Sequence, residues 1–238
     1  MKSTVKSAAF CALLSALASA NAVQVGVDPA KPWTGFMDIL ALPADGGALL
    51  GQSDWGVGDL AASFSNHVLT LSPNTSIARD VPLTDANWWK PDGSGNRNMN
   101  ASILVVDNSL SGQSITFAGF TLANSLVSPY TTLAFIRDFV PDFSSFVQSI
   151  VYLEGGQPFS ITLQSTPGNH PTYGFSTLGP NARLDQVAAL GSVQVTAVPE
   201  PATAAMFTAG VLGLLALRRR TLRQSPSPAT GLKAPGGA

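Results

Sequence analysis

The sequence is poor in the residues on which disulfide-bonded domains and most enzymes depend. Its 238 residues include one cysteine, Cys11, and two histidines, His67 and His170. A single cysteine excludes an internal disulfide, and Cys11 lies in an N-terminal segment that we expect to be removed, which leaves no thiol nucleophile. The two histidines do not form the ligand pattern of a zinc site.

Pairs of catalytic carboxylates are scarce as well. Between residues 23 and 198 the one glutamate is Glu154, so a glycosidase pair would need an aspartate partner. Glu154 precedes two glycines, which is typical of the end of a strand. No serine lies in a Gly-x-Ser-x-Gly pattern. The sequence therefore predicts no catalytic residue and no metal site, and we expect a protein that is not an enzyme.

Charged residues make up only 11% of the chain and are unevenly distributed. Residues 23–198 hold six basic and thirteen acidic side chains, a net charge of −7, whereas the residues from 199 onward carry a net charge of +4. An acidic body argues against nucleic acid and anionic lipid as partners, and it fits a cation-rich or neutral-polysaccharide setting. By the positive-inside rule, the C-terminal arginines should be cytoplasmic and the acidic body should lie outside.

The N-terminal segment has the pattern of a secretory signal peptide. Lys2 and Lys6 precede an apolar run over residues 8–17, and small residues follow at positions 18, 20 and 22. This arrangement predicts a signal peptide over residues 1–22, cleaved before Val23.

Three features follow one another near the C-terminus. Pro199, Glu200 and Pro201 come first, an apolar run follows over residues 202–217, and Arg218, Arg219 and Arg220 come last. Sixteen apolar residues give a helix of about 24 Å, which is short against a hydrocarbon core of about 30 Å. Arginine side chains can reach to the headgroups, so residues 198–223 can span a membrane. We expect the serine-, proline- and glycine-rich tail over 224–238 to be disordered.

In this order, the three features resemble the PEP-CTERM sorting signal of Gram-negative bacteria. The resemblance implies that the helix holds the exported protein in the inner membrane. An exosortase, which is a membrane cysteine transpeptidase, then cuts near Pro199–Pro201. The body passes to the cell surface, often into an exopolysaccharide matrix. The alternative is an ordinary single-pass anchor that is never cut.

The body over residues 23–197 reads as one domain of short strands separated by glycine-rich turns. Only residues 59–66 are expected to form a helix. The pattern predicts an all-β fold, an antiparallel β-sandwich of jelly-roll type flanked by the signal helix and the transmembrane helix. The expected strands cover residues 33–42, 68–71, 101–106, 115–120, 131–140, 146–153, 159–163, 173–177 and 187–197.

Short motifs in the body also look familiar. The segments 54–60, 88–93, 114–119, 134–139, 173–175 and 179–181 resemble a recurring body found with these sorting signals. That body is of uncharacterised function and is similar in outline to the galactose-binding-like jelly rolls of carbohydrate-binding modules. The resemblance implies a sandwich that could contact glycans, although fold analogy alone does not establish sugar binding.

Trp55, Trp88 and Trp89 are the candidate carbohydrate contacts, because a flat indole can stack on a pyranose ring. If Trp88 and Trp89 lay in one strand they would point to opposite sides, so at most one would face the core. The alternative is that both pack at a strand-to-loop corner without touching a ligand.

No cofactor is expected, although a structural calcium ion is conceivable. Oxygen-bearing side chains alternate at Asp92, Ser94, Asn96 and Asn98, but Arg97 and Ile103 occupy the places where an EF-hand needs glycine and glutamate. A solvated hairpin loop is the simpler interpretation. Three further aspartates could contribute to such a site, namely Asp28, Asp38 and Asp185.

The sequence thus predicts a non-catalytic exported protein of the cell surface or extracellular matrix, sorted by an exosortase and associated with exopolysaccharide. The second alternative is a matrix scaffold without a ligand. A glycan-active hydrolase is the third.

Overall fold

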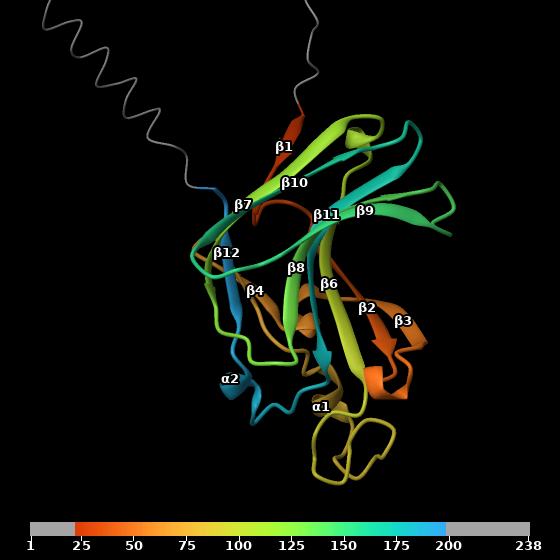
Figure 1. The fold of residues 1–238 in the computed structure, drawn as a ribbon, viewed down its shortest axis with the longest axis vertical. Coiled ribbons are helices and arrows are strands. Elements are labelled where there is room, and N and C mark those ends of the chain that lie inside the picture. Colours follow the sequence, from red (N-terminus) through yellow and green to blue (C-terminus); the bar gives the residue numbers. More distant parts are fainter. Residues whose placement is uncertain (1–21, 199–238) are drawn as a thin grey trace, which may run out of the picture. The chain divides into compact units, whose positions relative to one another are not determined.

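The computed structural model describes residues 22–198 (Figure 1). The chain divides into two units between Val198 and Pro199. Apart from residues 22 and 198, the predicted signal peptide, sorting segment and tail lie outside the described residues. Within residues 22–198, no helix is long and apolar enough to cross a membrane.

Two sheets of six strands each form a sandwich, which confirms the predicted fold class. Sheet A is formed by β1 (Val23–Val25), β4 (Ala62–Ser65), β5 (Val68–Leu71), β7 (Ser114–Asn124), β10 (Gln157–Gln164) and β12 (Val193–Thr196). β7 pairs with β10 along one edge and with β1 and β12 along the other. All of these pairs are antiparallel except β1 with β7, which is parallel.

Sheet B is entirely antiparallel and its order is β3-β2-β6-β11-β8-β9. Its strands are β2 (Thr34–Leu40), β3 (Leu49–Trp55), β6 (Asn98–Val106), β8 (Thr131–Phe139), β9 (Phe146–Tyr152) and β11 (His170–Pro180). In Figure 1 the two edge strands of this sheet, β9 and β3, lie toward the right of the view.

The core lies between the sheets and is built from alternate residues of each strand. On β6 these are Met99, Ala101, Ile103 and Val105, as period-two packing requires. Phe117 of β7 is at the centre, with its ring 5.2 Å from those of Tyr173 and Phe175 on β11. Because β7 belongs to sheet A and β11 to sheet B, these three rings join the two sheets. Burying an aromatic side chain of this size stabilises the fold by roughly 1.5–3 kcal/mol. Within residues 22–198, the core cluster draws on strands of both sheets.

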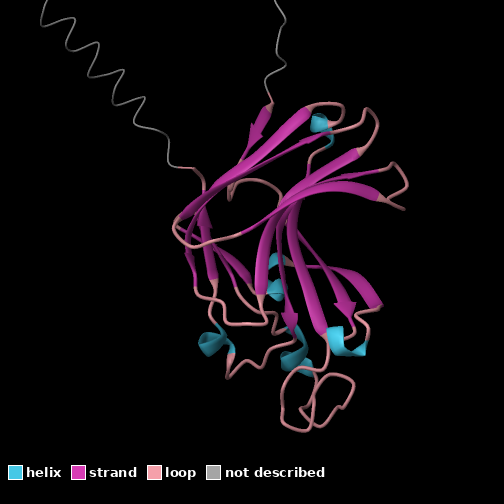
Figure 2. Ribbon diagram, viewed as in Figure 1, coloured by secondary structure: helices cyan, strands magenta, loops and turns pink. Residues whose placement is uncertain are grey.

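Helical segments are short and sit between strands (Figure 2). They are η1 (Pro43–Asp45), η2 (Val57–Leu60), α1 (Ser76–Asp80), η3 (Asn108–Leu110) and α2 (Val187–Leu190). The helix predicted over residues 59–66 is wrong: η2 ends at Leu60, Ala61 takes a left-handed conformation with φ of 56°, and β4 follows. The strand predicted over 187–197 is half wrong, because α2 and Gly191, with φ of 80°, precede β12.

Candidate functional site

Four loops meet at one end of the sandwich. One of them, residues 81–97, carries Trp88 and Trp89 and is called the tryptophan loop below. Leu40 of β2, Asn98 of β6 and Pro180 of β11 are adjacent in register, and β8 begins beside Leu178. The segments that precede or follow these residues therefore share this end, the lower one in Figure 1. They comprise residues 41–48, 81–97, 125–130 and 181–192.

Trp88 and Trp89 lie on a turn and not in a strand. Their backbone N–H groups both donate to the carbonyl oxygen of Asp85, at 3.1 and 2.9 Å. The chain then reverses, with Lys90 N donating to Ser94 O at 2.8 Å and an isolated bridge between Trp89 and Gly95. Strand alternation consequently does not decide where the two indoles point.

The two tryptophans differ in burial. Trp89 is only 2% exposed, whereas Trp88 is half-buried and packs against the core cluster. The Nε1 of Trp89 is buried and has no hydrogen-bond partner among the described residues. An unpaired buried N–H costs free energy. Burial of the large apolar surface of the Trp89 indole offsets this cost.

A cavity of about 520 Å³ adjoins Trp89. Leu83, Ala86 and Pro91 supply apolar wall, and Lys90, Asp92 and Arg183 supply charge. A second recess of about 230 Å³ lies beside it and shares Lys90 and Arg183. The tryptophan loop therefore borders space that a small ligand or one sugar residue could enter.

Two of the charged residues of this cavity, Arg183 and Asp92, form hydrogen bonds with near neighbours in the sequence. The Arg183 guanidinium forms two hydrogen bonds to Asp185, at 2.9 and 2.6 Å, which raise the pKa of Arg183 and lower the pKa of Asp185. Asp92 accepts hydrogen bonds from the hydroxyl and the backbone N–H of Ser94, at 2.7 and 2.9 Å, and these lower the pKa of Asp92. Both aspartates thus stabilise local turns.

The same contacts bear on calcium. Asn96 uses its amide N–H to donate to Ala86 O at 2.8 Å, and Asn98 is buried in β6. Asp28, Asp38 and Asp185 lie respectively before β2, within β2 and after β11. Across residues 22–198 there is no group of three or more histidine, cysteine, aspartate or glutamate side chains that could hold a metal ion.

Trp55 lies away from the tryptophan loop. It ends β3 opposite Gly35, which pairs with Ile103, whereas the loop end of β6 is at Asn98. Its Nε1 donates to Ser53 Oγ at 2.6 Å and its ring is half-buried against the core. The three candidate tryptophans therefore do not form one platform, and their contact with a glycan stays a prediction.

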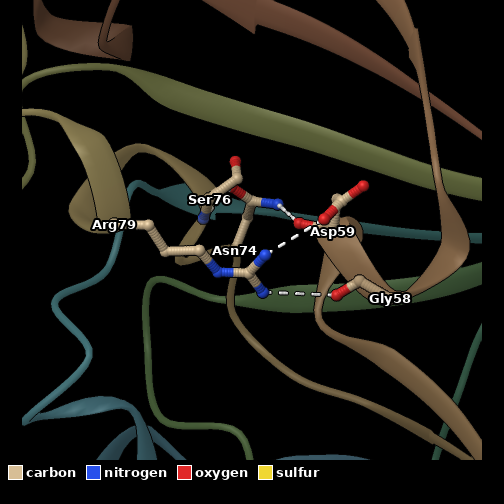
Figure 3. Close-up of polar contacts among 5 residues, drawn as sticks. All are labelled: Gly58, Asp59, Asn74, Ser76 and Arg79. Atoms are coloured by element: carbon tan, nitrogen blue, oxygen red, sulfur yellow. Dashed lines mark hydrogen bonds and ion pairs between the residues drawn. The ribbon is translucent and has the colours of Figure 1, made fainter.

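A polar cluster that includes Gly58 and Asp59 of the 54–60 motif connects η2 to α1 (Figure 3). Arg79 Nη1 donates to Asp59 Oδ1 at 3.0 Å, and Arg79 Nη2 to Gly58 O at 3.4 Å. Asn74 Nδ2 donates to the carbonyl oxygen of Asp59 at 3.4 Å. Because the Arg79–Asp59 pair is exposed, it contributes little stability, and we assign the cluster a structural role.

The residues considered for catalysis are dispersed. His170 starts β11, its Nδ1 lies 2.9 Å from Asn108 Oδ1, and its ring stacks on Phe143 at 4.7 Å. His170 pairs with Phe139 at one end of β8. Glu154 lies near the other end, because the preceding residue, Leu153, donates its backbone N–H to the carbonyl oxygen of Thr132. His67 lies in the turn between β4 and β5.

Sequence reasoning missed the outer face of sheet B, meaning the side away from sheet A. Core residues alternate with outward ones, so Phe36, Asp38, Asn100, Ser102, Ser176 and Tyr152 share this face. Asn100 Nδ2 donates to Asp38 Oδ2 at 3.0 Å, and the Ser176 hydroxyl donates to Asn100 Oδ1. Only strand register places these side chains in neighbouring rows.

An apolar block lies beside this polar chain on the same face. Phe135, Gly174 and Leu104 are adjacent in register, and Phe135 and Leu104 are buried although neither belongs to the core cluster. The Arg137 guanidinium covers the Phe135 ring at 3.9 Å, and its burial lowers the pKa of Arg137. At the border, Tyr152 of β9 is 60% exposed.

Comparison with known families identifies the C-terminal segment. Residues 197–220 match the family model described as the PEP-CTERM protein-sorting motif. The chain carries a PEP-CTERM sorting motif. The match begins one residue after β12 ends and includes Pro199–Pro201 and Arg218–Arg220, which confirms the resemblance. The motif marks the chain as an exported, exosortase-processed protein of the cell surface.

Solved structures show only distant likeness to this chain. The enzymatically active domain of tailspike protein 4 from bacteriophage CBA120 is 15% identical, with a TM-score of 0.32, over 54% of this chain and 14% of that one. For the CBM22-1–GH10 modules of a Clostridium thermocellum xylanase, the identity is 9% and the TM-score 0.25, over 44% of this chain and 22% of that one.

A third structure, of carbohydrate-binding modules from the β-sandwich superfamily, is 13% identical with a TM-score of 0.19, over 70% of this chain and 72% of that one. With TM-scores this low, none of these likenesses identifies a ligand or an activity for this chain. A comparison with curated proteins gave no match.

Proposed function

We propose that the protein acts without catalysis at the cell surface or in the extracellular matrix, where its sandwich associates with exopolysaccharide. Exosortase is its processing partner, and the inner membrane is its location before the cut. The signal peptide over 1–22, the sandwich over 23–197, the sorting segment over 198–223 and the tail over 224–238 are the parts that this proposal assigns.

The observation that carries the proposal is the row of side chains on the outer face of sheet B. Asp38, Asn100 and Ser176 form a continuous hydrogen-bonded chain, and Asp38 and Asn100 remain partly exposed. Phe36 lies beside this chain and Tyr152 at its border. Sugar rings stack on aromatic faces while carboxylates and amides take their hydroxyls, so this composition suits a glycan chain lying across the strands.

Charge favours a neutral or cation-bridged glycan over a polyanion. The face carries Asp38 and Asp54 against one guanidinium, Arg137, which is covered by its own contact with Phe135. The surrounding body has a net charge of −7. A polyanionic chain would be repelled at low ionic strength unless cations bridged it to the carboxylates. A shallow face of this kind should bind the glycan weakly, through many small contacts along the glycan chain.

The direct test titrates residues 22–198 with the exopolysaccharide of the host and measures binding by calorimetry. Tyr152→Ala should weaken binding by about tenfold, since full burial of an aromatic side chain is worth roughly 1.5–3 kcal/mol and a sugar ring covers part of it, whereas Tyr152→Phe keeps the ring and should bind nearly as well. Asp38→Ala should also weaken binding, while Asp45→Ala removes the same charge from the turn before β3 and should not.

A scaffold without a ligand is the competing function. It gains support if the intact body does not bind the polysaccharide at any ionic strength. If all four variants bind as the parent does, the glycan binds elsewhere on the body and not on the outer face of sheet B. Release of reducing sugar from the polysaccharide would instead favour the hydrolase alternative.

A further inference from the structure

The edges of the two sheets are protected unequally. An edge strand offers unpaired backbone groups to any other strand, and proteins blunt such edges by shortness, proline, bulges or charge. In sheet A, β1 has three residues, β4 has four and β10 carries Pro158. In sheet B, β3 carries Asp54 and its register with β2 shifts between Ile39 and Leu40. Each of these edge strands therefore has a protective feature.

The remaining edge strand, β9, has none of them. Its seven residues, Phe146–Tyr152, read FVQSIVY and contain no charge, proline or glycine. It pairs only with β8 among the described strands. Its exposed fractions are 45% at Phe146, 58% at Val147, 41% at Ile150 and 60% at Tyr152. Such apolar exposure along an unprotected edge marks an interaction surface.

We propose that two copies of this chain pair through β9, antiparallel about a twofold axis, with Ser149 of one copy opposite Ser149 of the other. In this register five of the seven residues of β9 meet a residue of the same kind, and Gln148 meets Ile150. Val147 meets Val151, and Phe146 meets Tyr152, with each pair on a single face of the joined sheet. β-branched and aromatic cross-strand pairs are the combinations that stabilise antiparallel strands most. A twofold contact makes every such pair twice.

Charge argues that the contact is specific to this edge. Two bodies of net charge −7 repel each other over most orientations, but β9 brings no charge into the contact. Added salt screens the repulsion and leaves strand pairing intact, so association should strengthen with ionic strength. Pairing would join the two six-stranded B sheets into one and set their outer faces side by side.

The first experiment is sedimentation equilibrium of residues 22–198 over a range of concentrations. We expect a monomer–dimer equilibrium for the parent. Ile150→Lys should weaken dimerisation by about tenfold or more, because a lysine on an edge strand opposes strand pairing. Leu49→Lys is the matched control, since Leu49 is 56% exposed on β3, at the opposite edge of the same sheet, and should leave dimerisation unchanged. Melting temperatures verify that both variants are folded.

The second experiment uses the lack of cysteine in residues 22–198. Ser149→Cys places one thiol at the proposed twofold axis, so two copies should form a disulfide-linked dimer under mild oxidation. Ser160→Cys is the control, because Ser160 is an exposed serine on β10, the edge strand of sheet A, and should stay monomeric. The proposal is wrong if the parent is monomeric at every concentration, if Ile150→Lys dimerises as the parent does, or if Ser149→Cys cross-links no faster than Ser160→Cys.

Discussion

The side-chain amide of Asn181 donates a hydrogen bond to the carbonyl oxygen of Trp88 at 3.0 Å, across 93 residues of sequence. The same side chain accepts a hydrogen bond from Arg97 N at 3.1 Å, and Asn181 N donates to Arg97 O at 2.9 Å. Asn181 is buried and thus fixes both sides of the tryptophan loop to the segment that follows β11.

Replacing Asn181 should therefore loosen this loop. Asn181→Ala leaves the Trp88 carbonyl and the Arg97 N–H without their partner, and should lower the free energy of unfolding by about 2–3 kcal/mol. Asn181→Asp keeps the acceptor for Arg97 but loses the donor to Trp88, so an intermediate loss is expected. Urea unfolding followed by tryptophan fluorescence measures both. Equal stability of all three proteins would show that the loop is held by other contacts.

Strands that form runs of apolar and β-branched residues between turns could be predicted from the sequence, and their loops could not. The predicted range 68–71 coincides with β5, and 131–140 differs from β8 by one residue, because each range is rich in such residues and is bounded by turn-forming ones. β1 was not predicted, since three residues carry too little pattern, and it forms by pairing with β7. β3 was also missed, because Leu49 and Leu50 are both exposed and the strand shows no alternation.

The candidate site on the outer face of sheet B depends on strand register, which cannot be read from local sequence patterns. Asp38 and Asn100 are 62 residues apart and Asn100 and Ser176 are 76 apart, so nothing local indicates that they join. Packing of Trp88 and Trp89 at a corner is one of two alternatives that the sequence leaves open, and the turn that places them is set by Asp85 and Asn181. Sequence patterns therefore predicted the layers, and long-range pairing decides the surface.

Asp138 is a buried carboxylate whose partners are all neutral donors. It accepts hydrogen bonds from Ser165 Oγ at 2.7 Å, Thr166 N at 2.9 Å and Asn169 Nδ2 at 2.8 Å, and so fixes the turn between β10 and β11. Asp138→Ala should cost more than about 2 kcal/mol, because it leaves several buried donors unpaired. Asp107→Ala is the control, since Asp107 caps the exposed turn at η3 and should cost about 1 kcal/mol. Thermal unfolding compares them, and a smaller loss for Asp138→Ala would contradict this account.

Two tyrosines should make the fold sensitive to alkali. Burial raises the pKa of Tyr130 to about 12, and burial with the nearby Asp107 and Asp28 raises the pKa of Tyr173 to about 12, from an ordinary value of 10.0. Between pH 10 and 12 the unfolded chain loses these protons and the folded chain keeps them. The free energy of unfolding should therefore fall as the pH rises through this window.

Tyr173→Phe tests this alkaline effect and one further point. The Tyr173 hydroxyl is buried and has no hydrogen-bond partner within residues 22–198, so its removal should leave stability at pH 7 unchanged or raise it by about 1 kcal/mol. The loss of stability between pH 10 and 12 should also become shallower than in the parent, as urea unfolding across this range would show. Tyr152→Phe, at an exposed position, is the control. A strongly destabilised Tyr173→Phe protein would mean that the hydroxyl has a favourable partner.

Sorting should depend on the Pro-Glu-Pro triplet. With Pro199, Glu200 and Pro201 all replaced by alanine, the full-length protein should remain in the inner membrane, because the exosortase site is lost while the apolar run is intact. Cell fractionation with an antibody against the body would detect this. As a control, three alanines at residues 225–227, in the tail beyond the motif, should leave sorting unchanged. Normal arrival of the triplet variant at the surface would favour an uncut anchor or another export route.

Alanine substitutions of Trp88 and Trp89 should have different effects, one on glycan binding and the other on the stability of the fold. Trp89 is 2% exposed, so Trp89→Ala should lower the free energy of unfolding by about 3–5 kcal/mol. Trp88 is half-buried, and part of its ring stays accessible beside the loop that borders the cavity. If this loop contacts a glycan, Trp88→Ala should weaken binding to the host exopolysaccharide while the melting temperature changes much less.

The comparison is made on residues 22–198 by melting and by calorimetric titration, with Trp55→Ala as the third variant. Trp55 is also half-buried, but it lies at the other end of β3, so its loss measures what an indole contributes outside the loop. Weaker binding by Trp88→Ala alone would assign the loop a share of the glycan contact. If Trp88→Ala and Trp89→Ala both merely destabilise the sandwich and bind in proportion to the folded fraction, the tryptophans are packing residues. The outer face of sheet B would then be the remaining place for the glycan, because its polar chain and its exposed ring do not depend on the loop.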